Sequence, residues 1–163
     1  MILNKQTKVR VATRPLARFL REAQRELRIA DCEVTVALVS DEEIATWNKA
    51  YRNKKGPTDV LSFPAISGAR YRFGEKQSKA PLKLRCSIAT SERNAAAARP
   101  LGDIAIAPET ARRYAKKNGR TLPRELRVLV LHGLLHLMGF DHECDTGQMN
   151  RIEIKMRQRL GVA

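Results

Sequence analysis

Apolar and polar positions along the chain follow two periods, and they predict helices and strands in mixed order. Residues 32–40 alternate with a period of two and are rich in valine, so they predict a strand. Further strands are expected at 59–66 and 102–107, and weaker alternation up to residue 12 favours an edge strand. In residues 14–29 the apolar side chains recur at helical spacing, at Leu16, Phe19, Leu20, Ala23 and Leu27.

Start and stop signals mark the remaining helices. Ser40, with Glu43 three residues later, forms a capping box and predicts a short helix through Trp47. Residues 107–119 predict a helix because they join helical spacing to a proline near the first turn and a glycine at the end. A last helix is expected at about 147–160, where another glycine follows the final leucine.

The segment 122–139 is apolar around nearly its whole circumference, so it is predicted to be the central buried helix, with Thr121 as its cap. Strands and helices in this order predict an α/β or α+β fold, in which helices pack on a small sheet. The chain has 163 residues, of which 43% are hydrophobic. This length is enough for one domain, residues 1–163, and hardly enough for two.

Residues 67–100 show no clear period and predict an irregular insertion between two strands. They contain eight basic and two acidic residues, so they supply six of the fourteen excess positive charges of the chain. Two interpretations stay open. The insertion is either a solvated loop without function or a basic arm that helps to hold nucleic acid.

The net charge of +14 favours a polyanionic partner, because lysine and arginine gain free energy by displacing counterions from phosphates. Nucleic acid is favoured over an anionic membrane or a merely charged surface. No stretch is apolar for long enough to cross a membrane, and the first residues lack the apolar stretch of a signal peptide. We therefore expect a cytoplasmic protein without a membrane partner, whose three widely spaced cysteines are reduced thiols.

All three histidines of the chain lie in residues 132–142, HGLLHLMGFDH. His132 and His136 are four residues apart on the predicted helix, so they share one face. Gly139 is expected to end the helix and turn the chain, which folds His142 back over the same face. Three nitrogen ligands leave a fourth position open to water, and this is the arrangement of a catalytic zinc site.

These residues also allow other interpretations. One histidine on an apolar helix is usually a core residue, but the third histidine and the intervening glycine favour a metal. Zinc is expected, although nickel, copper and iron also accept imidazole. Asp141 or Asp145 is expected to hold a second ring nitrogen, while a helix cap is the preferred interpretation of Asp145. Cys144 is a weaker candidate, since three histidines and water already complete the site.

The expected chemistry is hydrolysis, because zinc makes hydroxide available as a nucleophile near neutral pH. The spacing also matches H-E-x-x-H-x-x-G-x-x-H, the signature of one protease superfamily, in which the glutamate is the general base. Here the residue after His132 is Gly133, which cannot accept a proton. The ligands of that signature are present and its base is missing, which weighs against peptide hydrolysis.

Three blocks of the sequence resemble the YbeY family of bacterial endoribonucleases, also called rRNA maturation factors. HGLLHLMGFDH matches the family pattern H-G-x-L-H-L-x-G-[YF]-D-H completely, including Asp141. YRNKKGPTDVLSFP resembles a tyrosine-arginine stretch followed by P-T-D-V-L-S-F-P, and LGDIAIAPE resembles L-G-D-I-x-I before a helix. The order and spacing fit over most of the chain, except residues 67–100, where the family usually has a much shorter connection.

The resemblance implies a single-strand-specific, metal-dependent endoribonuclease that acts in ribosomal RNA maturation, notably at the 3′ end of 16S RNA, and in ribosome quality control. It implies about five helices packed with a roughly four-stranded mixed sheet, and one zinc ion held by His132, His136 and His142. Arg52 matches an arginine that faces the metal cleft and is needed for activity. We expect catalysis to depend on Arg52 and His136. The expected partners are single-stranded RNA, ribosomal RNA and the small ribosomal subunit, and not DNA.

The hypothesis for the mechanism is hydrolysis of a phosphodiester bond by water at the zinc ion, with Arg52 offsetting charge on the phosphate. Asp141 and Glu143 are the local candidates for the general base. A route through the ribose 2′-hydroxyl stays open and would leave a 2′,3′-cyclic phosphate. Ser62 and Thr58 are expected to form strand or turn hydrogen bonds rather than contact the substrate.

Two other functions stay open, namely a zinc metalloprotease-like hydrolase and a non-catalytic RNA-binding factor in ribosome assembly. Aromatic residues make up only 5% of the chain, so few side chains are available to stack on bases. Trp47 and Tyr51 lie near Arg52 in the sequence, and both are expected to be core or packing residues.

Overall fold

The computed structural model describes residues 1–65, 99–141 and 145–162. Most of the predicted insertion, residues 67–98, lies outside the described residues. Four strands form one sheet in the order β1-β2-β4-β3, with bounds β1 Ile2–Asn4, β2 Cys32–Leu38, β3 Val60–Pro64 and β4 Arg99–Ile106. The strands β1, β2 and β4 are parallel and β3 is antiparallel to β4, so the sheet is mixed.

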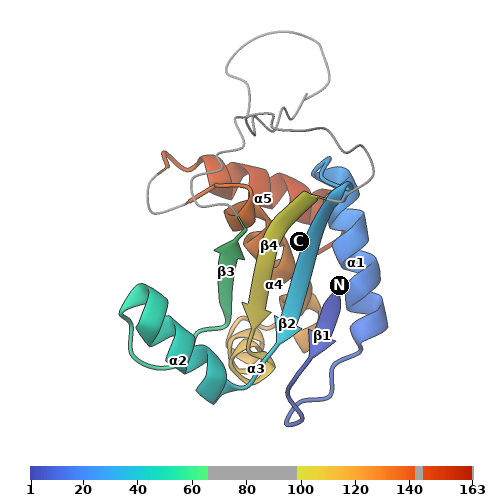
Figure 1. Cartoon of the computed structure of the whole chain (residues 1–163). Helices are drawn as coiled ribbons and strands as arrows, with labels where there is room; N and C mark the ends of the chain where they lie inside the picture. The colour runs from blue at the N-terminus through green and yellow to red at the C-terminus, as the bar shows by residue number, and fades with distance from the viewer. Residues whose placement is uncertain (66–98, 142–144, 163) are drawn as a thin grey trace, which may run out of the picture.

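Five helices complete the described part of the chain, as Figure 1 shows: α1 Thr13–Glu26, α2 Asp41–Arg52, α3 Pro108–Lys117, α4 Leu122–Leu137 and α5 Gln148–Arg159. The predicted α/β architecture, with about five helices and a mixed sheet of four strands, is confirmed. None of the described helices combines the length and the apolar character that crossing a membrane would require.

The main core lies between α4 and one face of the sheet. Alternation along β2 directs Val34, Val36 and Leu38 into this core, where they are buried with Ile104 and Ile106 of β4. The helices α1 and α5 pack on α4 from its other sides. The helix α4 is therefore the central buried helix that its all-round apolar pattern predicts, with ten buried residues.

The opposite face of the sheet is covered in part by α2. A second, smaller cluster joins Ile44 of α2 to Leu61, Ala105 and their neighbours. The helix α2 continues five residues beyond the predicted end at Trp47 and stops at Arg52. Asn53 ends it in the left-handed conformation, with φ of 53°. This longer helix carries Arg52 to the edge of the sheet beside β3.

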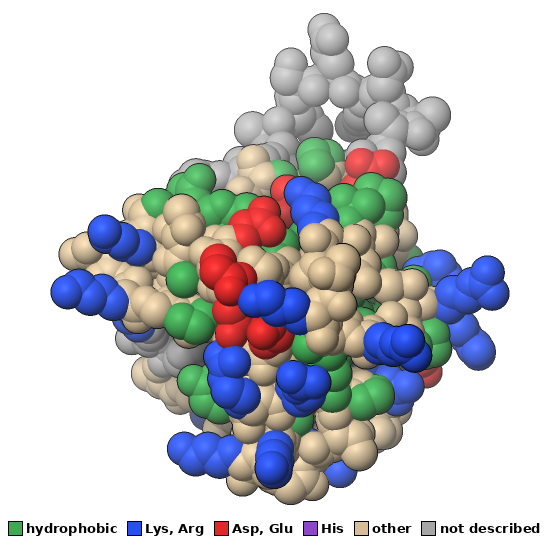
Figure 2. All heavy atoms as spheres, turned by 90° about the horizontal axis from the view of Figure 1, so that it is seen from below, with side chains coloured by type: hydrophobic (Ala, Val, Ile, Leu, Met, Phe, Trp, Pro, Cys, Tyr) green, Lys and Arg blue, Asp and Glu red, His purple; other side chains and the backbone are tan. Residues whose placement is uncertain are grey.

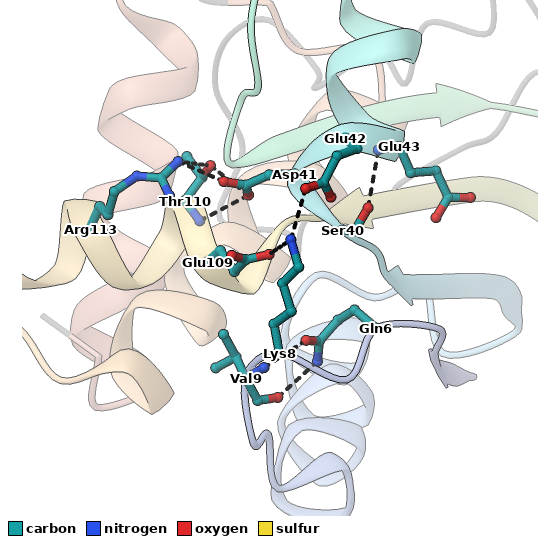
Figure 3. Close-up of polar contacts among 10 residues, drawn as sticks. All are labelled: Gln6, Lys8, Val9, Ser40, Asp41, Glu42, Glu43, Glu109, Thr110 and Arg113. Atoms are coloured by element: carbon teal, nitrogen blue, oxygen red, sulfur yellow. Dashed lines mark hydrogen bonds and ion pairs between the residues drawn. The ribbon is translucent and has the colours of Figure 1, made fainter.

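Polar contacts fix the other end of α2. Ser40 accepts a hydrogen bond from the Glu43 backbone N–H at 3.2 Å, as the capping box predicts. Asp41 accepts hydrogen bonds from the backbone N–H and the hydroxyl of Thr110, which joins α2 to the first turn of α3 (Figure 3). Arg113 donates to the same carboxylate at 2.8 Å. These contacts hold the helix that positions Arg52.

Acidic side chains gather at this end of the molecule, with lysine and arginine side chains around them, as Figure 2 shows. Lys8 lies 2.8 Å from Glu42 and 3.5 Å from Glu109. The hydrogen bond from Lys8 is the main reason why the pKa of Glu42 falls to about 2. Both side chains of the Lys8–Glu42 pair are largely exposed, so water and salt screen it and it adds little to stability.

The first strand is shorter than the pattern predicts. It ends at Asn4, whereas alternation continues to residue 12. The side chain of Gln6 explains the difference, because it accepts from the Val9 backbone N–H and donates to the Val9 carbonyl, both at 2.9 Å. Such side-chain bonds give the backbone a local alternative to a strand ladder.

Candidate functional site

The two described histidines lie together on α4. The Nε2 atoms of His132 and His136 are 3.1 Å apart, and the rings meet edge to face. This is the shared face that the four-residue spacing predicts. Imidazole nitrogens are donors that a metal ion can use, and here two of them lie close together.

A buried carboxylate holds the other side of the first ring. Oε2 of Glu153, on α5, lies 3.2 Å from Nδ1 of His132, and Oε1 accepts a hydrogen bond from Arg157 at 2.6 Å. Burial alone would raise the pKa of Glu153, but the contacts with His132 and Arg157 outweigh it and keep the pKa below its usual value. An ionised carboxylate at Nδ1 of a histidine favours the tautomer that carries its proton there, and this tautomer leaves Nε2 able to bind a metal ion.

The sequence did not predict Glu153. It pointed to Asp141 or Asp145 as the candidate partner of the histidines. Asp145 instead accepts hydrogen bonds from the backbone N–H groups of Gly147, Gln148 and Met149 at 2.6 to 3.0 Å. It therefore acts as the cap of α5, which was the preferred interpretation.

The chain turns sharply after α4, as predicted. Gly139 has φ of 86°, its N–H donates to the His136 carbonyl, and the Phe140 N–H donates to the Leu135 carbonyl. This is the Schellman pattern of a helix end. The turn brings Asp141 into the wall of the cleft that the histidines line. The third predicted ligand, His142, lies outside the described residues, as do Glu143 and Cys144.

An open cleft of about 850 Å³ lies where the second half of α4 faces β3 and the end of α2. His132, His136 and Arg52 all line it, together with the strand β3 and the turn after α4. Arg52 thus lines the same cleft as two histidines of α4 that come eighty or more residues later in the sequence. The structure brings together the described members of the predicted site in one concave surface.

Comparison with known proteins places the chain in a family. The family model described as Endoribonuclease YbeY matches residues 1–161. The chain belongs to the YbeY endoribonuclease family. A curated Endoribonuclease YbeY of Koribacter versatilis is 35% identical over 160 residues, covering 98% of this chain and 85% of that protein. One of Nautilia profundicola is 35% identical over 136 residues, covering 82% and 76%.

A solved structure agrees with this assignment. The solution structure of TM1509 from Thermotoga maritima aligns with a TM-score of 0.58 and 26% sequence identity. The alignment covers 98% of this chain and 89% of that one. The resemblance of HGLLHLMGFDH and the two other blocks to the YbeY family is therefore confirmed over nearly the whole chain.

The packing of Gly133 explains why this YbeY-family chain lacks the glutamate of the protease signature at that position. A Cβ at residue 133 would lie 2.8 Å from two side-chain atoms of Ile104, because α4 runs directly against β4. The position after the first histidine thus points into the sheet and leaves no room for a glutamate side chain. The absence of a general base there follows from the way α4 packs.

The motif TDVLSFP forms the cleft wall through its backbone. Ser62 donates a hydrogen bond to the Gly133 carbonyl at 3.4 Å, which ties β3 to α4. Thr58 donates to Asp59 at 3.2 Å, in the turn that precedes β3. Both hydroxyls form the strand and turn hydrogen bonds that the sequence predicts, and β3 ends at Pro64.

The described residues fit a zinc ion at the histidines. Two nitrogen ligands of a tetrahedral zinc ion are about 3.3 Å apart, close to the 3.1 Å between the two Nε2 atoms. A histidine that binds a metal through one ring nitrogen usually contacts a carboxylate through the other, and Glu153 provides this carboxylate for His132. Within residues 1–65, 99–141 and 145–162, no third histidine, cysteine or carboxylate completes a cluster with them.

Proposed function

We propose that this protein is a zinc-dependent endoribonuclease that cleaves single-stranded RNA. One observation carries the proposal: in a chain of the YbeY endoribonuclease family, His132, His136 and Arg52 line the same cleft. We further propose that it acts on ribosomal RNA in the cytoplasm, at the 3′ end of 16S RNA on the small subunit, and in ribosome quality control. The expectation that DNA is no substrate goes with this proposal.

His132, His136 and His142 would hold one zinc ion. When bound, the ion lowers the pKa of a water molecule and offsets negative charge on a phosphate. Glu153 keeps the His132 ring in the orientation and tautomer that a ligand needs. We assign His136 a role in catalysis through this ligation, since both its position and its lone pair serve the ion.

Arg52 is assigned to the phosphate. A guanidinium offers parallel N–H donors that match two oxygens of a phosphodiester, and its charge is permanent. Arg52 is the last residue of α2, so the helix places its backbone at the edge of the cleft that its side chain lines. The charge that builds on the phosphate oxygens during cleavage is then met by a positioned cation rather than by water.

Asp141 is the proposed general base, because it lines the cleft together with both histidines. Glu143, the other candidate, lies outside the described residues. The products decide which oxygen attacks. A 2′,3′-cyclic phosphate next to a 5′-hydroxyl indicates attack by the ribose 2′-hydroxyl, and a 5′-monophosphate next to a 3′-hydroxyl indicates attack by water.

The deciding experiment joins metal analysis to RNA cleavage. We expect the purified protein to contain about one zinc ion per chain, and we expect it to cut single-stranded RNA until a chelator removes the metal. Arg52→Ala is expected to lower the cleavage rate by about 10²- to 10³-fold, the usual cost of a lost transition-state donor. Arg112→Ala is the matched control, because Arg112 is an exposed arginine on α3 that does not line the cleft.

The same variants separate the alternative functions. A non-catalytic assembly factor would bind RNA but show no chelator-sensitive cleavage in any variant. If Arg52→Ala weakens RNA binding and leaves the cleavage rate at saturating RNA unchanged, the phosphate clamp is wrong. A peptidase would need a base in place of Gly133, and the packing of Gly133 against Ile104 argues against that function.

A further inference from the structure

The outer face of the sheet holds a second cavity, which no part of the proposed reaction uses. Its volume is about 500 Å³. Its floor is made of outward-facing residues of the two central strands, Thr35 and Ala37 of β2 and Asp103 and Ala105 of β4. Their neighbours in each strand point into the main core, so these four lie on the face opposite α4. Figure 1 shows α4 behind the sheet and this face toward the viewer.

Three aromatic side chains form one wall of the cavity. The rings of Trp47 and Tyr51 each meet the ring of Phe63 edge to face, with centroids 6.0 Å and 5.3 Å apart. Tyr51 is 71% exposed, so it is no core residue, although its ring packs on Phe63. Trp47 is half-buried and packs as expected. An exposed tyrosine next to two other rings offers the stacking surface that the low aromatic content of the chain made unexpected.

This wall is shared with the cleft of the histidines. Tyr51 and Phe63 line both cavities, and Arg52 follows Tyr51 directly in the chain. An RNA strand with a phosphate at Arg52 therefore has a neighbouring nucleotide beside the aromatic wall. Sequence-selective proteins read single-stranded RNA in this way, by stacking an unpaired base on aromatic rings and bonding its edge.

Asp103 supplies a group that can read a base edge. It is exposed, and it pairs across the sheet with Phe63 on one side and Thr35 on the other, so it lies in the same row as the aromatic wall. A carboxylate accepts hydrogen bonds only. Guanine presents two adjacent N–H donors on its Watson–Crick edge, adenine and cytosine present one amino group, and uracil presents a single ring N–H.

We propose that this cavity is a subsite for one unpaired nucleobase of the RNA, and that guanine fits it best. The base stacks on the exposed ring of Tyr51 and contacts the ring of Phe63, which lies at a steep angle to it, while Asp103 accepts its two N–H groups as a bidentate pair. The inference rests on the proposed function for the phosphate that leads into the subsite, and it adds a base preference to a cleft that otherwise recognises only the backbone.

Trp47 gives a direct test that does not depend on cleavage, because it is the single tryptophan of the chain and it lines the cavity. GMP, UMP and ribose 5-phosphate are titrated into the intact protein, with Trp47 fluorescence as the signal. We expect saturable quenching by GMP, weaker binding of UMP by roughly tenfold, and no quenching by ribose 5-phosphate. Quenching that is equal for GMP and UMP, or that ribose 5-phosphate reproduces, overturns the proposal.

Two variant pairs sharpen the test. Asp103→Asn is expected to remove most of the difference between GMP and UMP, whereas Glu33→Gln, an exposed acid on the same face of β2 outside the cavity, keeps it. Tyr51→Ala is expected to weaken GMP binding, whereas Tyr114→Ala, an exposed tyrosine on α3, leaves it unchanged. The proposal is wrong if each variant and its control behave alike.

Cleavage separates a failure of the subsite from a failure of the proposed function. Short RNAs that differ at a single nucleotide are cut by the native protein, and the rates are compared with those of Asp103→Asn. A preference for guanine that Asp103→Asn reduces supports the subsite. Equal rates for all four nucleotides overturn the subsite and leave the nuclease intact. Absence of chelator-sensitive cleavage, together with guanine-selective quenching of Trp47, sinks the proposed function and leaves the subsite standing.

Discussion

Glu153 lies against Nδ1 of His132, while Nε2 of the same ring faces Nε2 of His136 at 3.1 Å. The helix α4 alone would leave this ring free to rotate about its side-chain bonds. The contact with Glu153 restricts that rotation, and a buried, ionised carboxylate at this place favours a proton on Nδ1. The metal affinity of the site therefore depends on a residue that would not itself touch the ion.

Replacing Glu153 by glutamine is expected to weaken zinc binding by about tenfold, at the lower end of the usual range for such partners. The amide keeps the size of the side chain but loses the charge that favours a proton on Nδ1. Affinity is measured by competition with a chromogenic chelator. Glu26→Gln is the matched control, because Glu26 also pairs with an arginine, Arg159, but on the surface. Equal affinities in the two variants would contradict the role of Glu153.

The sequence predicted the two histidines and missed their partner for a definite reason. His132 and His136 are four residues apart on one helix, so local geometry alone brings them together. Glu153 is twenty-one residues from His132 and reaches it only because α5 packs on α4. Asp141 and Asp145 are candidates from the sequence because they are the aspartates nearest to the histidines, although a helix cap is the preferred interpretation of Asp145. A signal existed in the pattern of α5, where Glu153 takes an inward position between Met149 and Met156.

At the level of elements, α4 combines the face that carries His132 and His136 with a face that packs closely on the sheet. Gly133 belongs to the second face, where Ile104 leaves no space for a side chain. Glycine in a helix costs about 1 kcal/mol relative to alanine. The close contact with β4 outweighs this cost, since it sets how near α4 and its histidines lie to β3 and the cleft.

Gly133→Ala is expected to destabilise the protein by about 1 to 2 kcal/mol, because overpacking costs more than the gain in helix propensity. Urea unfolding, followed by circular dichroism, measures the change. The double variant with Ile104→Ala supplies the control. Ile104→Ala removes the atoms that the new methyl group would meet, so adding Gly133→Ala to it is expected to cost little. A stabilised Gly133→Ala variant would show that α4 can move away from β4.

The carboxylate of Asp145 accepts hydrogen bonds from the backbone at the start of α5, so the stability of this helix depends on pH. The backbone N–H groups of Met149, Gly147 and Gln148 outweigh the effect of burial and lower the pKa of Asp145 below 3.8, with help from the charge of Arg151. A carboxylate with a lowered pKa stabilises the fold above its unfolded pKa, and this stabilisation is lost as the pH falls through the folded value.

Asp145→Asn is therefore expected to lower the melting temperature at neutral pH and to have less effect as the pH falls below about 4, where aspartate in the unfolded chain also binds a proton. Thermal unfolding of metal-free protein across this pH range measures the difference between the two proteins. A difference that stays constant down to the most acidic conditions would mean that the charge of Asp145 does not stabilise the start of α5.

At the scale of the whole molecule, the hydrophobic pattern predicted the helices and strands but not the order of the strands in the sheet. Alternation in β2 identified its buried face, because that face repeats every second residue. The order β1-β2-β4-β3 depends on contacts between distant segments, and no local pattern specifies it. The open outer face, with its cavity at Asp103 and Tyr51, follows from that order, and so it became visible only in the structure.

The net charge of +14 leads to a prediction for the whole chain, because each phosphate contact releases counterions. The affinity for single-stranded RNA is expected to fall linearly on a log–log plot against salt, with a slope of about −0.7 per contact. We propose that the basic residues of the predicted insertion supply some of these contacts. Replacing seven of the eight by glutamine, all except Arg99 at the start of β4, should then make the slope shallower; the seven are Arg70, Arg72, Lys76, Lys79, Lys83, Arg85 and Arg93.

Fluorescence anisotropy of a labelled RNA measures this slope, and the comparison decides between the two interpretations of the insertion. Replacing Arg14, Arg18 and Arg21 of α1 by glutamine is the control, since these exposed residues do not line the cleft. A basic arm predicts a shallower slope for the insertion variant and little change for the control. If instead the two variants shift the slope in proportion to the charge removed, the insertion acts only through the total charge of the protein, as any solvated loop would.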